Sequence, residues 1–332
     1  MADIAIDLGT TNTLIHVRGR GIVVHEPSVV AVERDTGRVL AVGLEAKRML
    51  GRTPAGVIAV SPMRGGVIAD VDRVDLMLRY FLQRVLPRRR LGMRPRVLIT
   101  VPSGITEMER RAVRAGIVAA GAREVYMLPA PIAAAIGAGL PVTSPRGSMV
   151  VNIGGGTTEI GVIALSGIVA DTSIRVAGQH LDDLIGSFIR RNHNLLVGES
   201  TAEAVKIQIG SAYPDGEEGE MTVRGRDLVS GIPSTVRVNS REIRECIREP
   251  IQAITAAVRR ALEITPPELA SDIVDEGIVM TGGGAQLGGL GQLLANETHL
   301  PIHFDTEPVT TVVRGAGTVL ENWETYQDAL VA

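Results

Sequence analysis

Short apolar runs and longer stretches of helical periodicity alternate along this chain of 332 residues. The short runs are rich in β-branched residues and bounded by glycine or proline, which is typical of strands. Strands are predicted in a hairpin over 4–17 and at 30–32, 39–42, 97–102, 125–128, 149–151, 160–165, 277–279 and 301–304. Helices are predicted over 44–50, 75–86, 106–120, 131–138, 181–193, 202–209, 241–264, 287–296 and 309–323.

Several helix ends carry sequence signals. Thr106 with Glu109, and Ser200 with Glu203, have the spacing of a capping box, in which the two side chains satisfy amide groups of the first turn. Pro250 lies inside the helical stretch 241–264. Because proline lacks an amide N–H and clashes with the preceding turn, it should kink or divide that helix.

A run of three glycines and two threonines, residues 154–158, joins two of the predicted strands. Consecutive glycines reach backbone angles closed to other residues, so successive N–H groups can converge on an anion. The run lacks the lysine of a Walker loop, and a strand rather than a helix follows it, unlike a dinucleotide fingerprint. It is therefore either a phosphate-binding hairpin or a plain hairpin turn.

A second turn of the same kind favours the phosphate interpretation. Residues 7–13 again lie between two apolar strands, with Asp7 where the later copy has Asn152. Two such hairpins suggest a duplicated fold that closes on one ligand. A third glycine turn, at 282–284, follows a strand and precedes a helix, a geometry that presents amide groups to an anion or nucleotide.

Composition narrows the class of protein. The length favours two domains, and a hydrophobic fraction of 45% is ample for their cores. A net charge of −3 and an aromatic content of 2% argue against nucleic-acid binding. Cys246 is the single cysteine, no apolar run approaches about eighteen residues, and Asp3 and Asp7 speak against a signal peptide. We therefore expect a cytoplasmic protein.

The three glycine turns resemble the two phosphate motifs and the adenosine motif of the actin-like ATPase superfamily. Within it, residues 65–70, 133–141 and 265–269 resemble the MreB/Mbl family of bacterial cell-shape filament proteins. The resemblance implies an α/β, ribonuclease H-like duplicated fold with nucleotide in a central cleft. It implies two large domains, each with a smaller subdomain: IA (1–29, 66–143 and 308–332), IB (30–65), IIA (144–178 and 241–307) and IIB (179–240).

The resemblance also implies the residues that bind ATP. The phosphates would lie against both hairpin turns, with Thr158 near the γ-phosphate, and the adenosine against the third turn and a Glu-x-x-Lys pair. For that pair, a surface ion pair is the alternative explanation. The implied nucleotide-binding residues are Thr10, Thr11, Asn12, Gly154, Gly155, Gly156, Thr157, Glu203, Lys206, Gly282, Gly283, Gly284 and Ala285.

Two departures from the family pattern bear on hydrolysis. Asp7 can hold Mg²⁺ through water, but Asn152 replaces a second expected aspartate. Ala130 stands where the family has a water-orienting glutamate, and losing such a group typically costs about a hundred- to ten-thousandfold in rate. We therefore expect ATP binding with slow or absent hydrolysis, unless another carboxylate, such as Glu107 or Glu159, substitutes.

Residues 87–96 hold five arginines around Leu91 and Met93. Such a segment suits an anionic bilayer, with cations near the headgroups and two apolar tips inserted; a solvated basic turn is the alternative. In MreB-like proteins this connection is where a membrane-insertion loop lies.

The resemblance finally implies partners and a place in the cell. It implies head-to-tail homopolymer filaments, peripheral at the inner face of the cell membrane, that organise wall synthesis with membrane proteins of cell-wall elongation. Nucleic acid is not an expected partner. The alternatives are a sugar or acetate kinase, for which no acceptor-pocket motif is found, and a chaperone-type ATPase, which needs a separate peptide-binding domain.

Overall fold

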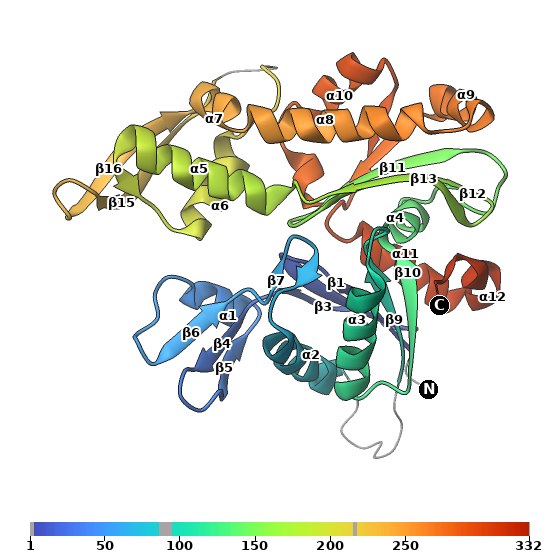
Figure 1. Ribbon diagram of the computed structural model, residues 1–332, viewed down its shortest axis with the longest axis horizontal. Coiled ribbons are helices and arrows are strands. Elements are labelled where there is room, and N and C mark those ends of the chain that lie inside the picture. The colour runs from blue at the N-terminus through green and yellow to red at the C-terminus, as the bar shows by residue number, and fades with distance from the viewer. Residues whose placement is uncertain (1–2, 86–94, 215–217, 332) are drawn as a thin grey trace.

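The structure, a computed structural model, describes residues 3–85, 95–214 and 218–331. Within these residues the chain forms two large halves, each built on a five-stranded sheet, and Figure 1 shows the two sheets facing one another across the middle of the molecule. The first half contains the chain's N-terminal strands and its C-terminal helices. The second half contains the intervening residues.

The two sheets have the same construction. In each, the first strand pairs antiparallel with the second and parallel with a strand that arrives much later in the sequence. The first sheet has the order β10-β9-β1-β2-β3, made of β1 (Asp3–Leu8), β2 (Asn12–Val17), β3 (Gly21–Pro27), β9 (Arg96–Val101) and β10 (Glu124–Pro129). The second has the order β13-β12-β11-β17-β18, made of β11 (Ser148–Ile153), β12 (Thr158–Ala164), β13 (Gly167–Ile174), β17 (Ile278–Thr281) and β18 (Ile302–Phe304). The predicted duplication is therefore present in the strand order itself.

Each half also has a small three-stranded sheet with helices beside it. In the first half this part comprises β4 (Val30–Glu33), β5 (Val39–Val42), α1 (Leu44–Met49) and β6 (Val57–Val60). In the second it comprises α5 (Gly178–His193), β14 (Leu195–Leu196), α6 (Glu199–Ile209), β15 (Glu220–Asp227), β16 (Pro233–Asn239) and α7 (Ser240–Cys246). Both small sheets lie inside the residue ranges predicted for subdomains IB and IIB; the boundaries themselves stay predictions.

The remaining elements pack on the large sheets and connect them. A short hairpin and two helices belong to the first half: β7 (Met63–Arg64), β8 (Val67–Ile68), α2 (Val71–Val85) and α3 (Glu107–Ala119). Four belong to the second half: α8 (Arg248–Glu263), α9 (Pro267–Glu276), the 3₁₀ turn η1 (Gly283–Gln286) and α10 (Leu290–Thr298). The chain ends with α12 (Trp323–Tyr326) and η2 (Gln327–Ala329).

Two helices, α4 (Ala130–Gly137) and α11 (Thr311–Glu321), join the halves. They pack on each other and share one buried core with residues of both sheets, such as Leu98 and Val150. Their backbones touch: a Cβ atom at Gly315 would clash with the carbonyl oxygen of Ala133, and one at Gly137 with that of Thr311. Only glycine allows this approach, so the two halves are held together by a helix pair in backbone contact.

The helix signals in the sequence had mixed outcomes. Thr106 and Glu109 form the predicted capping box. Residues 241–264 are divided, as predicted, and Pro250 lies in the first turn of α8, where its missing N–H costs little. The capping box predicted at Ser200 is wrong, because α6 begins after Gly198 without a side-chain cap. The helix predicted from residue 287 begins at 290, after a 3₁₀ turn and Gly289 in the left-handed conformation.

Because α4 and α11 are in backbone contact, any side chain larger than that of glycine at position 315 should destabilise the protein. Gly315→Ala should destabilise the protein by about 1–3 kcal/mol, because the added methyl forces the helices apart. Gly116→Ala on α3 is the matched control; its Cβ meets open space, so it should be neutral or stabilising by about 0.5–1 kcal/mol. Urea denaturation measures both, and equal stability of the two variants would contradict the packing described.

Candidate functional site

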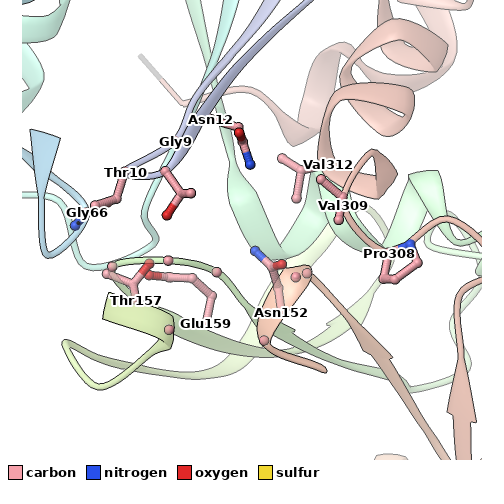
Figure 2. A pocket seen from close by; sticks show the side chains of 18 of the residues that line it. Gly9, Thr10, Asn12, Gly66, Asn152, Thr157, Glu159, Pro308, Val309 and Val312 are labelled. Carbon is pink, nitrogen blue, oxygen red and sulfur yellow. Dashed lines mark hydrogen bonds between the residues drawn. The ribbon is translucent and has the colours of Figure 1, made fainter. Parts of the chain in front are cut away.

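A cavity of about 550 Å³ lies between the two halves. Figure 2 shows Thr10 and Asn12, from the β1–β2 turn, on one side of it and Asn152, Thr157 and Glu159, from β11 and β12, on the other. Residues of α5, α6, the turn after β17 and the segment leading into α11 complete the lining. The cavity therefore takes its walls from both copies of the duplicated motif.

The two hairpin turns approach each other closely at one end of the cavity. A Cβ atom at Gly155 would clash with Thr11 Oγ1, and one at Gly156 with Thr10 Oγ1. Thr10 Oγ1 also accepts a hydrogen bond of 2.9 Å from the amide of Gly66. The glycines of the second turn are thus required by the neighbouring turn, and the predicted convergence of the two hairpins is present.

The backbone of the second turn leaves donors available. The carbonyl groups of Gly154 and Gly155 are occupied, since they accept from the amides of Gly178 and Gln179 at the start of α5. Among the described residues, no group accepts a hydrogen bond from the amides of Gly155, Gly156 or Thr157. Unbonded amides beside a cavity are costly unless a ligand or water takes them, so the turn is suited to an anion.

The structure does not bring Thr158 to the cavity, against the prediction. Its side chain is fully buried, and its hydroxyl donates to the carbonyl oxygen of Val176 at 2.7 Å. Side chains of a strand alternate between its faces, so Thr157 and Glu159 line the cavity while Thr158 points into the second half. Thr157 is the threonine placed to contact a ligand.

The third glycine turn contributes backbone rather than side chains. Gly282, Gly283 and Gly284 line the cavity, as predicted, whereas Ala285 is buried and does not. Gly282 has a φ of 84°, and a Cβ there would clash with the carbonyl oxygen of Ile153. Glycine at this position lets the third turn lie directly against the end of β11.

Asp7 is a poorly compensated carboxylate in the cavity wall. It accepts a hydrogen bond of 2.9 Å from Thr100 Oγ1, and burial raises its pKa to about 6. Asn152, from the equivalent strand of the second half, also lines the cavity. A half-buried carboxylate with one hydrogen-bond donor among the described residues favours a nearby cation, and Mg²⁺ prefers carboxylate and water oxygens. The described residues contain no group of three or more acidic, histidine or cysteine side chains that could hold a metal by themselves.

Glu203 and Lys206, the predicted ribose and base contacts, both line the cavity but have other ion-pair partners than each other. Lys206 Nζ lies 2.8 Å from a carboxylate oxygen of Asp182 and 3.1 Å from the carbonyl oxygen of Gly178. Burial raises the pKa of Asp182 to about 6, although the Lys206 ammonium draws it down. Glu203 instead lies 2.8 Å from Lys47 on α1, so this ion pair joins α6 of the second half to α1 of the first.

Sequence reasoning missed Lys47 and Asp182 as parts of the site. Both are distant in sequence from the residues they contact, and neither lies in a glycine turn. One signal was available: Lys47 and Lys206 are the only lysines in the chain; Lys206 lines this cavity, and Lys47 pairs with Glu203, which also lines it.

Ala130 occupies the position where the family has a water-orienting glutamate. Ala130, the first residue of α4, lines the cavity and offers no side-chain acceptor. Of the two candidate substitutes, Glu107 is exposed, pairs with Arg111 at 3.0 Å and does not line the cavity. Glu159 lines it and is buried.

The predicted membrane segment lies outside the described residues, which include neither Leu91 nor Met93. Within the described ranges, every helix is too short or too polar to span a bilayer.

Comparison with known proteins places the chain in a family. The family model described as MreB/Mbl protein matches residues 1–328. The cell shape-determining protein MreB of Escherichia coli K12 is 51% identical over 323 residues, covering 96% of this chain and 93% of the relative. Mbl of Bacillus subtilis 168 is 47% identical, covering 97% and 96%.

Solved structures confirm the predicted fold class. MreB5 of Spiroplasma citri, in a crystal structure bound to ADP, has a TM-score of 0.91 at 36% identity, covering 98% of both chains. MamK, in a double helical filament, has a TM-score of 0.80 at 22% identity, covering 96% of this chain and 98% of that one, and so supports the fold alone. The chain is therefore a member of the MreB/Mbl family of actin-like, cell shape-determining proteins.

Proposed function

We propose that this protein binds ATP in the cavity between its halves and that the ATP-bound protein assembles into filaments. The observation that carries the proposal is the meeting of two duplicated turns, one of which lines the cavity with Gly155, Gly156 and Thr157, whose amides have no acceptor among the described residues. The related MreB5 of Spiroplasma citri has been crystallised with ADP and with AMPPNP. Phosphates would be held by the turns of both halves, so the ligand would favour the closed arrangement.

The remaining predicted contacts follow from the same placement. The adenosine would lie against Gly282–Gly284, and its ribose near Glu203 and Lys206. Mg²⁺ fits the site because Asp7 is a half-buried carboxylate in the cavity wall, and Thr100 is its one hydrogen-bond donor among the described residues. Asp7 would hold the ion through water with Asn152 nearby, and the ion would offset the phosphate charge.

Hydrolysis would be slow, because Ala130 supplies no acceptor for the attacking water. The chain's membership of a cell shape-determining family supports a structural role, in which the bound nucleotide controls assembly rather than serving rapid turnover. Nothing in the cavity favours a kinase or chaperone function.

The filaments would form by head-to-tail association of this chain, the kind of contact that does not close. MamK, which shares the fold, forms a double helical filament. We place the filaments at the cytoplasmic face of the cell membrane, held by Leu91 and Met93 and the surrounding arginines, and in contact with membrane proteins of wall elongation. Sedimentation with ATP on vesicles of anionic lipid tests this part, with neutral vesicles as the control.

The turn-to-turn contact predicts how ATP affinity responds to a single methyl group. Gly155→Ala should weaken ATP binding about tenfold or more, since its Cβ displaces Thr11 and disturbs hydrogen bonds to a charged ligand. Gly56→Ala, whose Cβ meets open space, is the control and should bind like wild type. Titration with a fluorescent ATP analogue measures both; equal affinity of all three proteins would exclude this cavity as the nucleotide site.

The missing glutamate predicts a gain of function. Ala130→Glu should raise the rate of phosphate release by at least about tenfold, because it restores a water-orienting group beside the cavity. A phosphate-release assay under saturating Mg·ATP is the measurement. If wild type already hydrolyses ATP at a rate that the variant does not exceed, slow hydrolysis by loss of this group is refuted.

The raised pKa of Asp7 predicts that the stability of the folded protein depends on pH and on Mg²⁺. The folded pKa of Asp7, about 6, is raised above the ordinary 3.8, so its contribution favours the folded state at low pH and is lost as pH rises through about 6. Asp7→Asn should therefore raise the Tm of the nucleotide-free protein at pH 7 by about 2–6 °C.

With ATP present, added Mg²⁺ should stabilise wild type at pH 7 but progressively less below pH 6, and should not stabilise Asp7→Asn at any pH. Thermal unfolding from pH 5 to 8, with and without Mg²⁺, measures both effects. An undiminished Mg²⁺ effect in the variant would show that Asp7 does not hold the ion.

A further inference from the structure

Glu159 is a buried carboxylate at the cavity that none of the predicted nucleotide contacts uses. It lies on β12, one step beyond Thr158, and its side chain faces the cavity together with that of Thr157 (Figure 2). Only 1% of the residue is exposed. Burying an ionised carboxylate is costly unless donors compensate it, so its presence here calls for an explanation.

Three hydrogen bonds hold this carboxylate in one orientation. Oε2 accepts from the amide and the hydroxyl of Ser103, both at 3.2 Å, and Oε1 accepts from the hydroxyl of Ser173 at 2.7 Å. Ser103 follows β9 of the first half, whereas Ser173 lies on β13 of the second. An ionised carboxylate has about four acceptor positions, so about one remains, on Oε1.

The carboxylate of Glu159 lies close to the start of α4, where Ala130 lines the cavity. Strands β9 and β10 run parallel with Val101 beside Pro129, so the segment leading to Ser103 runs beside Ala130. From the other side, Gly161 shares a face of β12 with Glu159, and a Cβ at Gly161 would lie 2.7 Å from Pro131 Cβ. The segment that leads to Ser103 and the residue Gly161, which both neighbour Glu159, therefore both lie beside the start of α4.

We propose that Glu159 orients the water that attacks the terminal phosphate, in place of the glutamate that Ala130 has replaced. The inference rests on ATP binding in this cavity. Ala130 has no side-chain acceptor for this water. The free position on Glu159 Oε1 accepts the water's hydrogen bond instead. The water oxygen bonds to the terminal phosphorus, the bond from that phosphorus to the bridging oxygen of ADP breaks, and the water's second proton leaves to solvent.

A water-orienting role for Glu159 explains why its negative charge is stabilised by hydrogen-bond donors from both halves, Ser103 and Ser173. The Ser103 bonds join Glu159 to the first half and the Ser173 bond joins it to the second, so the arrangement that would orient the water needs both halves in place. A negative carboxylate close to the phosphates also repels them, which keeps the rate low even with the water in place.

The test compares Glu159→Gln with wild type and with Glu107→Gln, the exposed control carboxylate outside the cavity. Gln keeps the size of the side chain and one accepting oxygen but removes the charge. Single-turnover phosphate release gives the rate at saturating Mg·ATP, and titration with a fluorescent ATP analogue gives Kd. Glu159→Gln should lower the rate at least about tenfold with Kd changed less than about twofold, and Glu107→Gln should change neither.

A second variant separates a lost water contact from a damaged fold. Ala130→Glu/Glu159→Gln should release phosphate at least as fast as wild type, because the restored glutamate orients the water. The proposal is overturned if Glu159→Gln binds ATP and keeps the wild-type rate, or if wild type releases phosphate no faster than buffer. It is also overturned if Glu159→Gln and the double variant both lose ATP binding, because that result would mark a structural role for Glu159. Failure of wild type to bind ATP would instead refute the nucleotide site itself.

Discussion

The close approach of two glycine turns is the constraint on which the rest of this structure depends. The β1–β2 turn and the β11–β12 turn come from opposite halves, and a Cβ atom at Gly155 or Gly156 of the second turn would clash with Thr11 or Thr10 of the first. The carbonyl groups of Gly154 and Gly155 in the second turn are bonded to the start of α5, whereas the amides of Gly155, Gly156 and Thr157 have no acceptor within the described part of the chain. The result is a donor-rich surface that is complete only when both halves are in place, which couples whatever binds there to the relative position of the halves.

The connections between the halves differ in strength along the cavity. At its base, α4 and α11 are in backbone contact within a shared core, a rigid attachment. At its mouth, the Lys47–Glu203 pair has side chains 30% and 27% exposed, so it contributes about 0–1 kcal/mol and weakens with salt. Between them lie the Ser103–Glu159 contacts. A protein fixed at the base and weakly tied at the mouth is suited to open and close over a ligand.

Much of this fold and site could be predicted from the sequence, because glycine-rich turns between β-branched strands are local signals. They indicated both hairpins, the duplication and the third turn. Which threonine faces the cavity could not be predicted from local sequence: Thr157 ends the turn and Thr158 begins β12, and the packing of the second half decides which of the two is buried. The Ser200 capping box failed because α6 begins at Glu199, before Ser200, and Glu203 pairs instead with Lys47, a residue 156 positions distant. Ion pairs between distant segments, like those of Lys47 and Asp182, leave no pattern in a single sequence.

The central claim is that one triphosphate is held by both turns at once. The most direct measurement is a crystal structure of the protein with Mg²⁺ and a non-hydrolysable ATP analogue. We expect the amides of Gly155, Gly156 and Thr157 and the β1–β2 turn at Thr10 and Thr11 to lie within hydrogen-bonding distance of the same phosphate chain. An analogue bound to only one of the two turns, or outside the cavity, would contradict the account.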